Sequence, residues 1–405
     1  MHISIFVYGT WGDIRPHVVL GMALQKAGHT VQVVASQGYE SWIRSRNLDF
    51  YSLSTDADTF ARENAGVLDE NVIRQFQIMR KSMRPNLVRT RTDVLEATRK
   101  TDVLITGEFG ISFLFDIIKV NKLRSLFINT FPLSFSRDVP SVITPPAPDW
   151  LPLPQLYNRM SHSMVRRMQW LLFGQSSSSY KEFQAFVDAA SALTIVSQHV
   201  FPRPLDWREN WQVTGYLFDD DPDWTPPQDL LDFLNMGEPP VYIGFGSMPD
   251  SKPETTTRTV IEAVQRTGKR AIILTGWAGL GAENVQENIH ILKYAPHSWL
   301  FPRTAAVIHH GGAGTTAAGF RAGVPTIIAP HTADQPYWGR RAQELGVGTA
   351  PIPRKKLTVE NLAAAINQAT TIRTMQTNAK ALGEKIRQED GLGETVKWVE
   401  RFLSI

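Results

Sequence analysis

One stretch of the chain combines the features of a buried strand, a glycine-rich turn and a helix: residues 305–325 read AAVIHHGGAGTTAAGFRAGVP. Glycines at 311, 312 and 314 let the backbone come close to a ligand, and the helix that opens after them offers free N–H groups and positive potential. The hydroxyl of Thr315 and the ring of His310 add hydrogen-bond donors. The stretch therefore predicts a diphosphate-binding loop formed by His310, Gly312, Ala313, Gly314 and Thr315.

Two other interpretations of this stretch stay open. Residues 312–317 also match the G-x-G-x-x-A pattern of dinucleotide-binding proteins, and Asp334 lies about twenty residues further on, where that pattern places an acidic residue. A single match of this kind is a weak signal, and here it follows a histidine pair. The third interpretation is a glycine-rich turn with a structural role only.

The same order of strand, loop and helix recurs along the chain. Near the N-terminus it predicts a strand over residues 3–8, a turn over 9–13, a helix over 16–27 and a strand over 31–35. Further apolar strands are predicted at 103–106, 125–129, 193–196, 241–245, 271–274, 289–292, 306–309 and 326–329. Short apolar strands that alternate with helices are typical of parallel sheets, so the chain is predicted to be an α/β protein.

Length and composition divide the chain. Its 405 residues favour two domains, at roughly 100–200 residues for each. The acidic, proline-rich run FDDDPDWTPP at 218–227 suits an inter-domain connection. We predict an α/β domain over residues 1–217, a connection over 218–239, a second α/β domain over 240–385 and a C-terminal helix within 386–405 that can pack back on the first domain. Two such domains imply a cleft lined by the loops that follow their strands.

Composition also excludes several classes of function. The absence of cysteine excludes disulfides, zinc–thiolate sites, iron–sulfur clusters and a cysteine nucleophile. A net charge of +3, without a concentrated basic stripe, argues against a nucleic-acid-binding protein. The absence of cysteine also fits a cytoplasmic protein. The sequence shows neither an apolar run of about 18 residues nor a signal peptide. It makes no prediction about oligomeric state.

Two further segments follow predicted strands. Asp334 and Gln335 place a carboxylate beside an amide, a combination suited to the hydroxyls of a sugar, although an Asp–Gln helix cap before Pro336 is the alternative. Residues 9–16 read GTWGDIRP, and the carboxylate of Asp13 can accept a proton from an acceptor hydroxyl. The alternative is that Asp13 caps the helix predicted to begin near Pro16.

These residues together carry a resemblance. The chain resembles the family-1 glycosyltransferases of the GT-B fold, in which two Rossmann-like α/β domains face each other across a cleft. It looks closest to the sterol 3β-glucosyltransferases and the bacterial natural-product glycosyltransferases. The matching segments are APHSWLFP at 295–302, HHGGAGTT at 309–316, DQP at 334–336, GFGSM at 244–248, Gly276-Trp277 and GTWGDIRP at 9–16. One residue departs from the pattern, because those relatives commonly carry arginine where this chain has Trp11.

The resemblance implies a function and roles for these residues. An inverting enzyme would move a hexose, with glucose expected, from a UDP-sugar to a hydroxyl of a lipophilic acceptor, with Asp13 as general base. By the same resemblance, Ser247 joins His310 and residues 312–315 at the diphosphate, and Asp334 and Gln335 hold the sugar. Trp277 and His297 lie around the nucleobase, and Thr10 and Trp11 contact the acceptor. The nucleotide sugar is a co-substrate, so no cofactor is expected.

The sequence says less about the acceptor than about the donor. Residues 156–173 place Tyr157, Met160, Met164 and Met168 along one helical face. Such a stripe is typical of a buried helix face, and it also suits an acceptor-pocket wall or a peripheral membrane contact.

The pairs Asp56/Asp58 and Asp221/Asp223 resemble the D-x-D metal motif of another glycosyltransferase fold, but a helix cap and the connection explain them better. No metal is therefore expected.

Two other functions fit the predicted architecture. A sugar-nucleotide 2-epimerase shares the two-domain arrangement and needs no acceptor. A non-catalytic sugar-nucleotide or lipid-binding protein would bind the donor without transfer. Asp13 argues against the binding protein, because a protein that only binds has no need of a base at that position.

Overall fold

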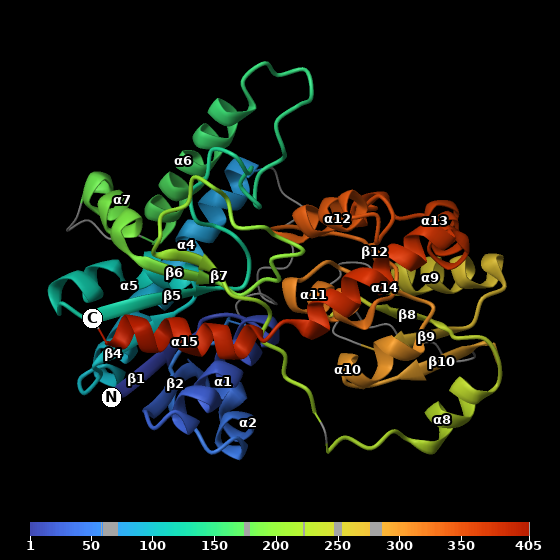
Figure 1. The fold of residues 1–405 in the computed structure, drawn as a ribbon, viewed down its shortest axis with the longest axis horizontal. Coiled ribbons are helices and arrows are strands. Elements are labelled where there is room, and N and C mark those ends of the chain that lie inside the picture. Colours follow the sequence, from blue (N-terminus) through green and yellow to red (C-terminus); the bar gives the residue numbers. More distant parts are fainter. Residues whose placement is uncertain are drawn as a thin grey trace. The chain divides into compact units, whose positions relative to one another are not determined.

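The computed structural model describes residues 1–57, 59, 72–173, 179–221, 223–246, 253–275 and 286–404. The chain divides into two compact units. The first unit contains Met1–Asp219 together with Asp390–Ile405, and the second contains Asp220–Glu389. Each unit is built on a parallel sheet covered by helices (Figure 1), which confirms the predicted α/β class.

The sheet of the first unit has the strand order β3-β2-β1-β4-β5-β6-β7. Its strands are β1 (His2–Phe6), β2 (Thr30–Ser36), β3 (Asp49–Leu53), β4 (Val103–Thr106), β5 (Arg124–Asn129), β6 (Ser191–Thr194) and β7 (Trp211–Val213), all parallel to their neighbours. The strand order reverses between β1 and β4. Ligands of open parallel sheets bind at the carboxyl ends of the strands at such a switch point.

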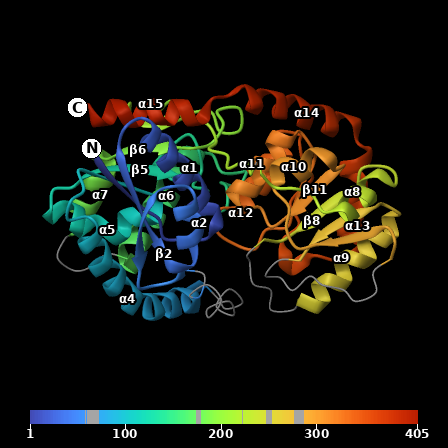
Figure 2. The ribbon, with the colours of Figure 1, turned by 90° about the horizontal axis from the view of Figure 1, so that it is seen from below.

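Helices cover both faces of this sheet. They are α1 (Trp11–Lys26), α2 (Glu40–Ser45), α4 (Val72–Ala97), α5 (Glu108–Val120), α6 (Pro154–Phe173), α7 (Tyr180–Ala189) and α15 (Gly391–Leu403), with a short 3₁₀ turn, η1 (Gln37–Tyr39). Helix α15 packs against α1 (Figure 2), and Val399 and Leu403 join the same apolar core as Ile5 and Val18. Helices α4, α5, α6 and α7 pack in sequence on one another.

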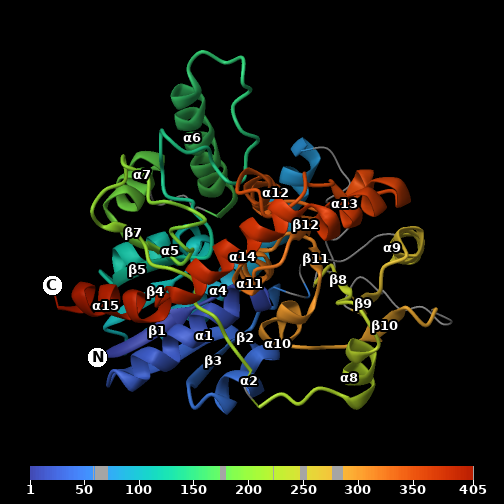
Figure 3. The same ribbon diagram turned by 45° about the vertical axis from the view of Figure 1, so that its right-hand side comes forward.

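The second unit has a five-stranded sheet with the order β10-β9-β8-β11-β12 (Figure 3). Its strands are β8 (Val241–Gly244), β9 (Ala271–Leu274), β10 (Ile289–Leu292), β11 (Ala306–His309) and β12 (Thr326–Ile328). Its helices are α8 (Gln228–Asn235), α9 (Pro253–Thr267), α10 (His297–Leu300), α11 (Ala313–Ala322), α12 (Gln335–Glu344), α13 (Val359–Thr371) and α14 (Arg373–Gln388), with 3₁₀ turns η3 (Phe301–Arg303) and η4 (Arg354–Lys356). The strand order reverses between β8 and β11.

Two differences from the predicted elements have simple causes. Helix α1 begins at Trp11 and not near Pro16, so the prediction of a turn over residues 9–13 is wrong. The cause is a capping box, in which the N–H of Thr10 donates to Oδ2 of Asp13 at 2.9 Å. Helix α8 lies inside the predicted connection because Leu230 and Phe233, one turn apart, are buried in the second unit.

Hydropathy gives a further result. Among the helices in the described part of the chain, none is long and apolar enough to cross a membrane.

Candidate active site

The glycine-rich loop of the second unit turns sharply between β11 and α11. Nδ1 of the buried His309 accepts the N–H of Gly311 at 2.9 Å. Gly311 has φ +94°, a left-handed conformation that favours glycine, and a Cβ there would lie 2.6 Å from a methyl group of Ile328. Gly312 is the N-cap of α11 and provides no side-chain cap for the first N–H groups of this helix. The turn therefore leaves these groups available to an anion.

His310 is held between two glycines from neighbouring strands. A Cβ on Gly246 would lie 2.7 Å from Cε1 of His310, and a Cβ on Gly312 would lie 2.5 Å from its Nε2. Gly246 follows β8 and His310 follows β11, and these two strands pair at the point where the strand order reverses. The structure thus places the predicted loop and His310 at the switch point of the second sheet.

The protonation state of His310 follows from its burial. Desolvation, with a smaller contribution from His331, lowers the pKa of His310 to about 4. Burial lowers the pKa of the adjacent His309 well below its ordinary value, and His310 and His297 lower it further. Both rings are therefore neutral at pH 7, and His310 can donate one hydrogen bond without carrying charge.

The low pKa of His310 predicts a change in stability with pH. The unfolded chain binds a proton at this site near pH 6.5 and the folded protein only near pH 4, so stability is lost as the pH falls through that window. Replacing His310 with glutamine should remove about 2 to 3 kcal/mol of this loss between pH 7 and pH 4.5. Urea denaturation of both proteins at the two pH values measures it. Equal losses in the two proteins would contradict the assignment.

The predicted sugar-binding residues lie in the loop after β12, the neighbour of β11. The indole N–H of Trp338 donates to Oδ2 of Asp334 at 2.6 Å. Oε1 of Gln335 accepts the N–H of His331 at 2.8 Å. Asp334 occupies the N-cap position of α12 but makes no side-chain cap hydrogen bond. The loop therefore holds the carboxylate and the amide in fixed orientations rather than using them to cap the helix.

The residues predicted around the nucleobase are only partly described. His297 begins α10, and its ring stacks on Phe301 with centroids 4.3 Å apart. Trp277, and Ser247 of the predicted diphosphate site, lie outside the described residues.

In the first unit, the loop after β1 packs closely against the carboxylate of Asp13. A Cβ on Gly9 would overlap Oδ2 of Asp13, so only glycine fits at position 9. Asp13 stands at the third position of α1 and not at its N-cap, because Thr10 takes that place. A cavity at the carboxyl ends of β1, β4 and β5 is lined by Asp13 and by residues that include Tyr8, Gly107 and Thr130. Asp13 therefore lies at the switch point of the first sheet.

His17 lines the same cavity and was not singled out from the sequence. It lies one helical turn after Asp13, is buried, and its Nδ1 lies 2.7 Å from the backbone oxygen of Asp13. Burial lowers the pKa of His17, so the ring is neutral and Nδ1 donates this hydrogen bond. The spacing of four residues on one helix face was the available signal.

Trp11 packs elsewhere. Its ring meets Tyr39 and Trp42 edge-on, with centroid distances of 4.8 and 5.2 Å, and the guanidinium of Arg15 lies 5.3 Å from it. Trp11 thus contacts η1 and α2 and is absent from the residues that line the cavity at Asp13. Contacts of Thr10 and Trp11 with an acceptor stay a prediction.

The methionine stripe of α6 does not form a buried face, so that interpretation is wrong. Met160 is 63% exposed and Met164 is 52% exposed. The buried face of α6 instead carries polar side chains, and they can be buried because they are hydrogen-bonded. Asn158 donates to the backbone oxygen of Arg137, and Arg166 donates to Asp188. The periodicity of the sequence separates the two faces of α6, but it does not show which face packs against the rest of the unit.

The candidate metal motif at Asp56 and Asp58 contains a hydrogen bond typical of a helix cap. Oδ2 of Asp56 accepts the hydroxyl of Thr59 at 2.6 Å, as in a helix cap, while Asp58 lies outside the described residues. Over the part of the chain that the structure covers, no group of three or more His, Asp or Glu side chains could hold a metal ion.

Comparison with protein families gives two matches. Residues 3–132 match the glycosyltransferase family 28 N-terminal domain. Residues 259–400 match the erythromycin biosynthesis protein CIII-like C-terminal domain. The two models cover parts of the first and the second half of the chain.

Curated proteins similar to the chain include sterol 3-beta-glucosyltransferases. UGT80A2 of Arabidopsis thaliana is 31% identical over 98% of this chain and 65% of its own length. UGT80B1 of the same plant is 30% identical over 100% of this chain and 68% of its own length. The enzyme of Cryptococcus neoformans is 31% identical, and the chain spans 27% of it. The chain thus spans two thirds or less of most of these relatives.

Solved structures similar to the chain include two glycosyltransferases. The glycosyltransferase of kitacinnamycin has a TM-score of 0.72 at 16% identity, with 99% of both chains covered. The calicheamicin glycosyltransferase CalG4 has a TM-score of 0.71 at 16% identity, covering 100% of this chain and 98% of its own. These likenesses confirm the GT-B fold that the sequence resemblance implied.

Proposed function

Because the chain belongs to the GT-B glycosyltransferases that include the sterol 3β-glucosyltransferases, we propose that it transfers a hexose to a lipophilic hydroxyl compound. The donor is a nucleoside-diphosphate sugar, with UDP-glucose as the first choice. The observation that carries the proposal is the placement of neutral His310 between Gly246 and Gly312, beside the uncapped start of α11. The solved structure of SsfS6, which shares the fold, holds thymidine diphosphate.

The second unit supplies the donor site in this proposal. N–H groups of residues 312–315 and the ring of His310 bind the diphosphate and stabilise the charge that it gains on leaving. The site needs no metal in this scheme, because the helix start already provides positive potential. Asp334 and Gln335 bind hydroxyls of the sugar from the next loop along the sheet.

The first unit supplies the base. The carboxylate of Asp13 accepts the proton of the acceptor hydroxyl while that oxygen attacks the anomeric carbon from the face opposite the leaving diphosphate. A carboxylate is a weak base, so proton transfer occurs late, as the new bond forms. Inversion at the anomeric carbon follows from this single displacement.

Ligand binding gives a direct test of the donor proposal. UDP-glucose is expected to raise the melting temperature by several degrees, more than GDP-sugars do, because a ligand that binds only the folded state stabilises it. Transfer assays with 3β-hydroxysterols and polyketides then follow with the best donor. A melting temperature unmoved by UDP-, TDP- and GDP-sugars would contradict a donor site at His310.

We further propose that α6 rests on an anionic membrane surface, in keeping with the peripheral contact predicted from the sequence. Trp150 and Leu153 lie just before this helix, and Met160 and Met164 lie on one of its faces; each of the four side chains is more than half exposed. Arg159 and Arg167 are exposed on the same helix, which contains no Asp or Glu. Apolar side chains flanked by arginine suit an interface of anionic lipids.

Exchanging both Met160 and Met164 for glutamate should lower binding to vesicles containing anionic lipid by about tenfold or more. The exchange removes two apolar side chains that would be buried among the lipids and adds two negative charges that anionic lipids repel. Co-sedimentation with vesicles measures the change. Leu205→Glu is the control, because Leu205 is 94% exposed and lies outside α6. Equal binding by the double variant and the control would contradict this surface.

A further inference from the structure

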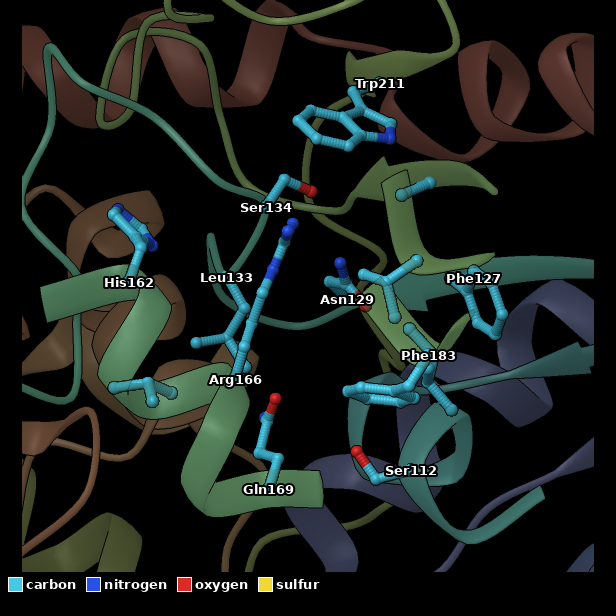
Figure 4. A pocket seen from close by; sticks show the side chains of 14 residues that line it. Ser112, Phe127, Asn129, Leu133, Ser134, His162, Arg166, Gln169, Phe183 and Trp211 are labelled. Atoms are coloured by element: carbon cyan, nitrogen blue, oxygen red, sulfur yellow. The ribbon is translucent and has the colours of Figure 1, made fainter. Parts of the chain in front are cut away.

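The loop that follows β5 begins beside Asp13 and then runs against α6. Its first residues, Thr130 and Phe131, line the cavity that contains Asp13. Leu133 and Ser134, a few residues further on, line a second cavity together with side chains of α6. Figure 4 shows this second group, with His162, Arg166 and Gln169 contributed by the helix. One loop therefore joins the surroundings of Asp13 to α6.

Polar side chains on the buried face of α6 hydrogen-bond the backbone of this loop. Nδ2 of Asn158 donates to the backbone oxygen of Arg137 at 2.9 Å. One helical turn later, Nε2 of His162 lies 3.1 Å from the backbone oxygen of Val139. Burial lowers the pKa of His162 to about 4, so the ring is neutral at pH 7 and Nε2 donates this hydrogen bond. Asn158 and His162 are both buried, so the two hydrogen bonds are shielded from water.

The irregular backbone of the loop explains why this face of α6 is polar. A loop has neither strand nor helix partners for its backbone oxygens, and such groups need hydrogen bonds wherever water is excluded. Apolar side chains would leave them unsatisfied. Hydrogen bonds are also directional, so they stabilise one conformation of the loop over others.

A second segment holds the same part of the loop. Oδ1 of Asp206 accepts the hydroxyl of Ser136 at 2.8 Å, and Oδ2 accepts the N–H of Arg137 at 2.6 Å. The ring of Phe135 lies 5.4 Å from the guanidinium of Arg166 on α6. Residues 135–139 are therefore fixed both by α6 and by the segment that contains Asp206.

Only a short stretch separates these residues from the sheet. Asn129 is the last residue of β5, and its backbone oxygen accepts the N–H of Ile195 at 2.9 Å. Residues 130–134 lie between this strand end and the fixed residues 135–139. Five residues with both ends fixed have few conformations, and release of one end would give Thr130 and Phe131 many more.

We propose that Asn158 and His162 are positioning residues for the acceptor. By holding the loop after β5, they keep Thr130 and Phe131 as a fixed wall beside Asp13, against which the acceptor presents its hydroxyl. The inference rests on the proposed glycosyl transfer and adds α6 to the residues that determine acceptor binding. Both side chains act through the loop rather than by contact with the substrate.

The main test replaces Asn158 with leucine, which has a similar size but no hydrogen-bond donor. The KM for a 3β-hydroxysteroid should rise about tenfold, the effect expected when a buried backbone oxygen loses its partner. The kcat and the affinity for UDP should each change by less than about twofold, because Asp13 and the proposed donor site stay in place. Kinetics at saturating UDP-glucose and calorimetry with UDP provide these values.

Two variants of His162 show whether the hydrogen bond is responsible. His162→Gln keeps an N–H donor in the place of Nε2 and should hold the acceptor KM within about threefold of the wild type. His162→Leu removes the donor and should raise the KM as Asn158→Leu does. This pair also decides the test if Asn158→Leu does not fold.

A matched control lies at the opposite edge of the same sheet. Nδ2 of Asn210 donates to the backbone oxygen of Ala190 at 2.8 Å, directly before β7 and β6 begin. Asn210→Leu should leave the acceptor KM unchanged. Equal rises in Asn158→Leu and Asn210→Leu, or a wild-type KM in both leucine variants of α6, would overturn the inference.

Steroid binding without donor separates failure of this inference from failure of the proposed function. Calorimetric titration should show affinity about tenfold weaker in Asn158→Leu than in the wild type. That result without any transfer by the wild type would reject glycosyl transfer and retain the positioning role. Transfer with an acceptor KM that ignores both α6 residues would retain the function and reject the positioning role.

Discussion

Replacing Asp13 with asparagine is expected to lower the rate of glycosyl transfer by about 10²- to 10⁴-fold, because an amide cannot take the proton of the attacking hydroxyl. The amide oxygen can still accept the N–H of Thr10, which the carboxylate accepts at 2.9 Å, so α1 keeps its start. Donor affinity should stay within about twofold, since the base is not part of the proposed diphosphate site.

A matched control separates this effect from the general loss of a carboxylate. Oδ2 of Asp102 accepts the N–H of His2 at 2.8 Å before β4 begins, at the opposite end of the first sheet. Asp102→Asn should therefore leave kcat/KM unchanged. Steady-state kinetics with calorimetric titration of the donor provides both numbers. Near-wild-type turnover by Asp13→Asn, with donor binding intact, would remove Asp13 from the mechanism.

Replacing His310 with alanine is expected to weaken binding of the nucleoside diphosphate by about 10- to 100-fold, the effect of losing one hydrogen bond to a charged group. Gly312→Ala should have a similar effect for a different reason. Its Cβ would lie 2.5 Å from Nε2 of His310, so the ring must leave its place between Gly246 and residue 312. Acceptor affinity should be unaffected by either change.

Calorimetry with UDP measures both variants. Gly237→Ala serves as the control, because Gly237 lies in the same unit and a Cβ there would make only an ordinary 3.7 Å contact with Arg270. UDP affinity unchanged by His310→Ala would argue against the proposed diphosphate site. A loss in Gly237→Ala equal to that in Gly312→Ala would show that the effect is general destabilisation.

The sequence predicted the strands that are buried on both faces, because such strands are continuous apolar runs. It missed β3 and β7 for physical reasons. Strand β3 contains Asp49 and Ser52 among its apolar residues, and strand β7 (Trp211–Val213) has only three residues. The start of α1 was misplaced because Pro16 suggested a first helical turn, although Thr10 and Asp13 already have capping-box spacing.

The positions of candidate site residues were predictable from the sequence where those residues lie in a loop directly after a strand. His310, Gly312, Asp334 and Gln335 all follow strands, so their place at the sheet edge followed from the sequence. Contacts between distant segments did not. The packing of His310 against Gly246 joins residues 64 positions apart by their numbering and is visible only in three dimensions.

Burial was the least predictable property of the site. On α6 the polar side chains of Asn158, His162 and Arg166 are buried, whereas Met160 and Met164 are exposed. An amphipathic pattern specifies two faces, but the partners that hydrogen-bond the polar face lie elsewhere in the chain.

Product analysis is the decisive measurement of whether the protein transfers a hexose to a lipophilic hydroxyl compound. With UDP-glucose and a 3β-hydroxysteroid, we predict a β-glucoside of the steroid, one UDP released for each glucoside, and little UDP release without the acceptor. Conversion of UDP-N-acetylglucosamine into its 2-epimer without any acceptor, or UDP release at the same rate with and without acceptor, would show that the protein is not a transferase acting on such an acceptor.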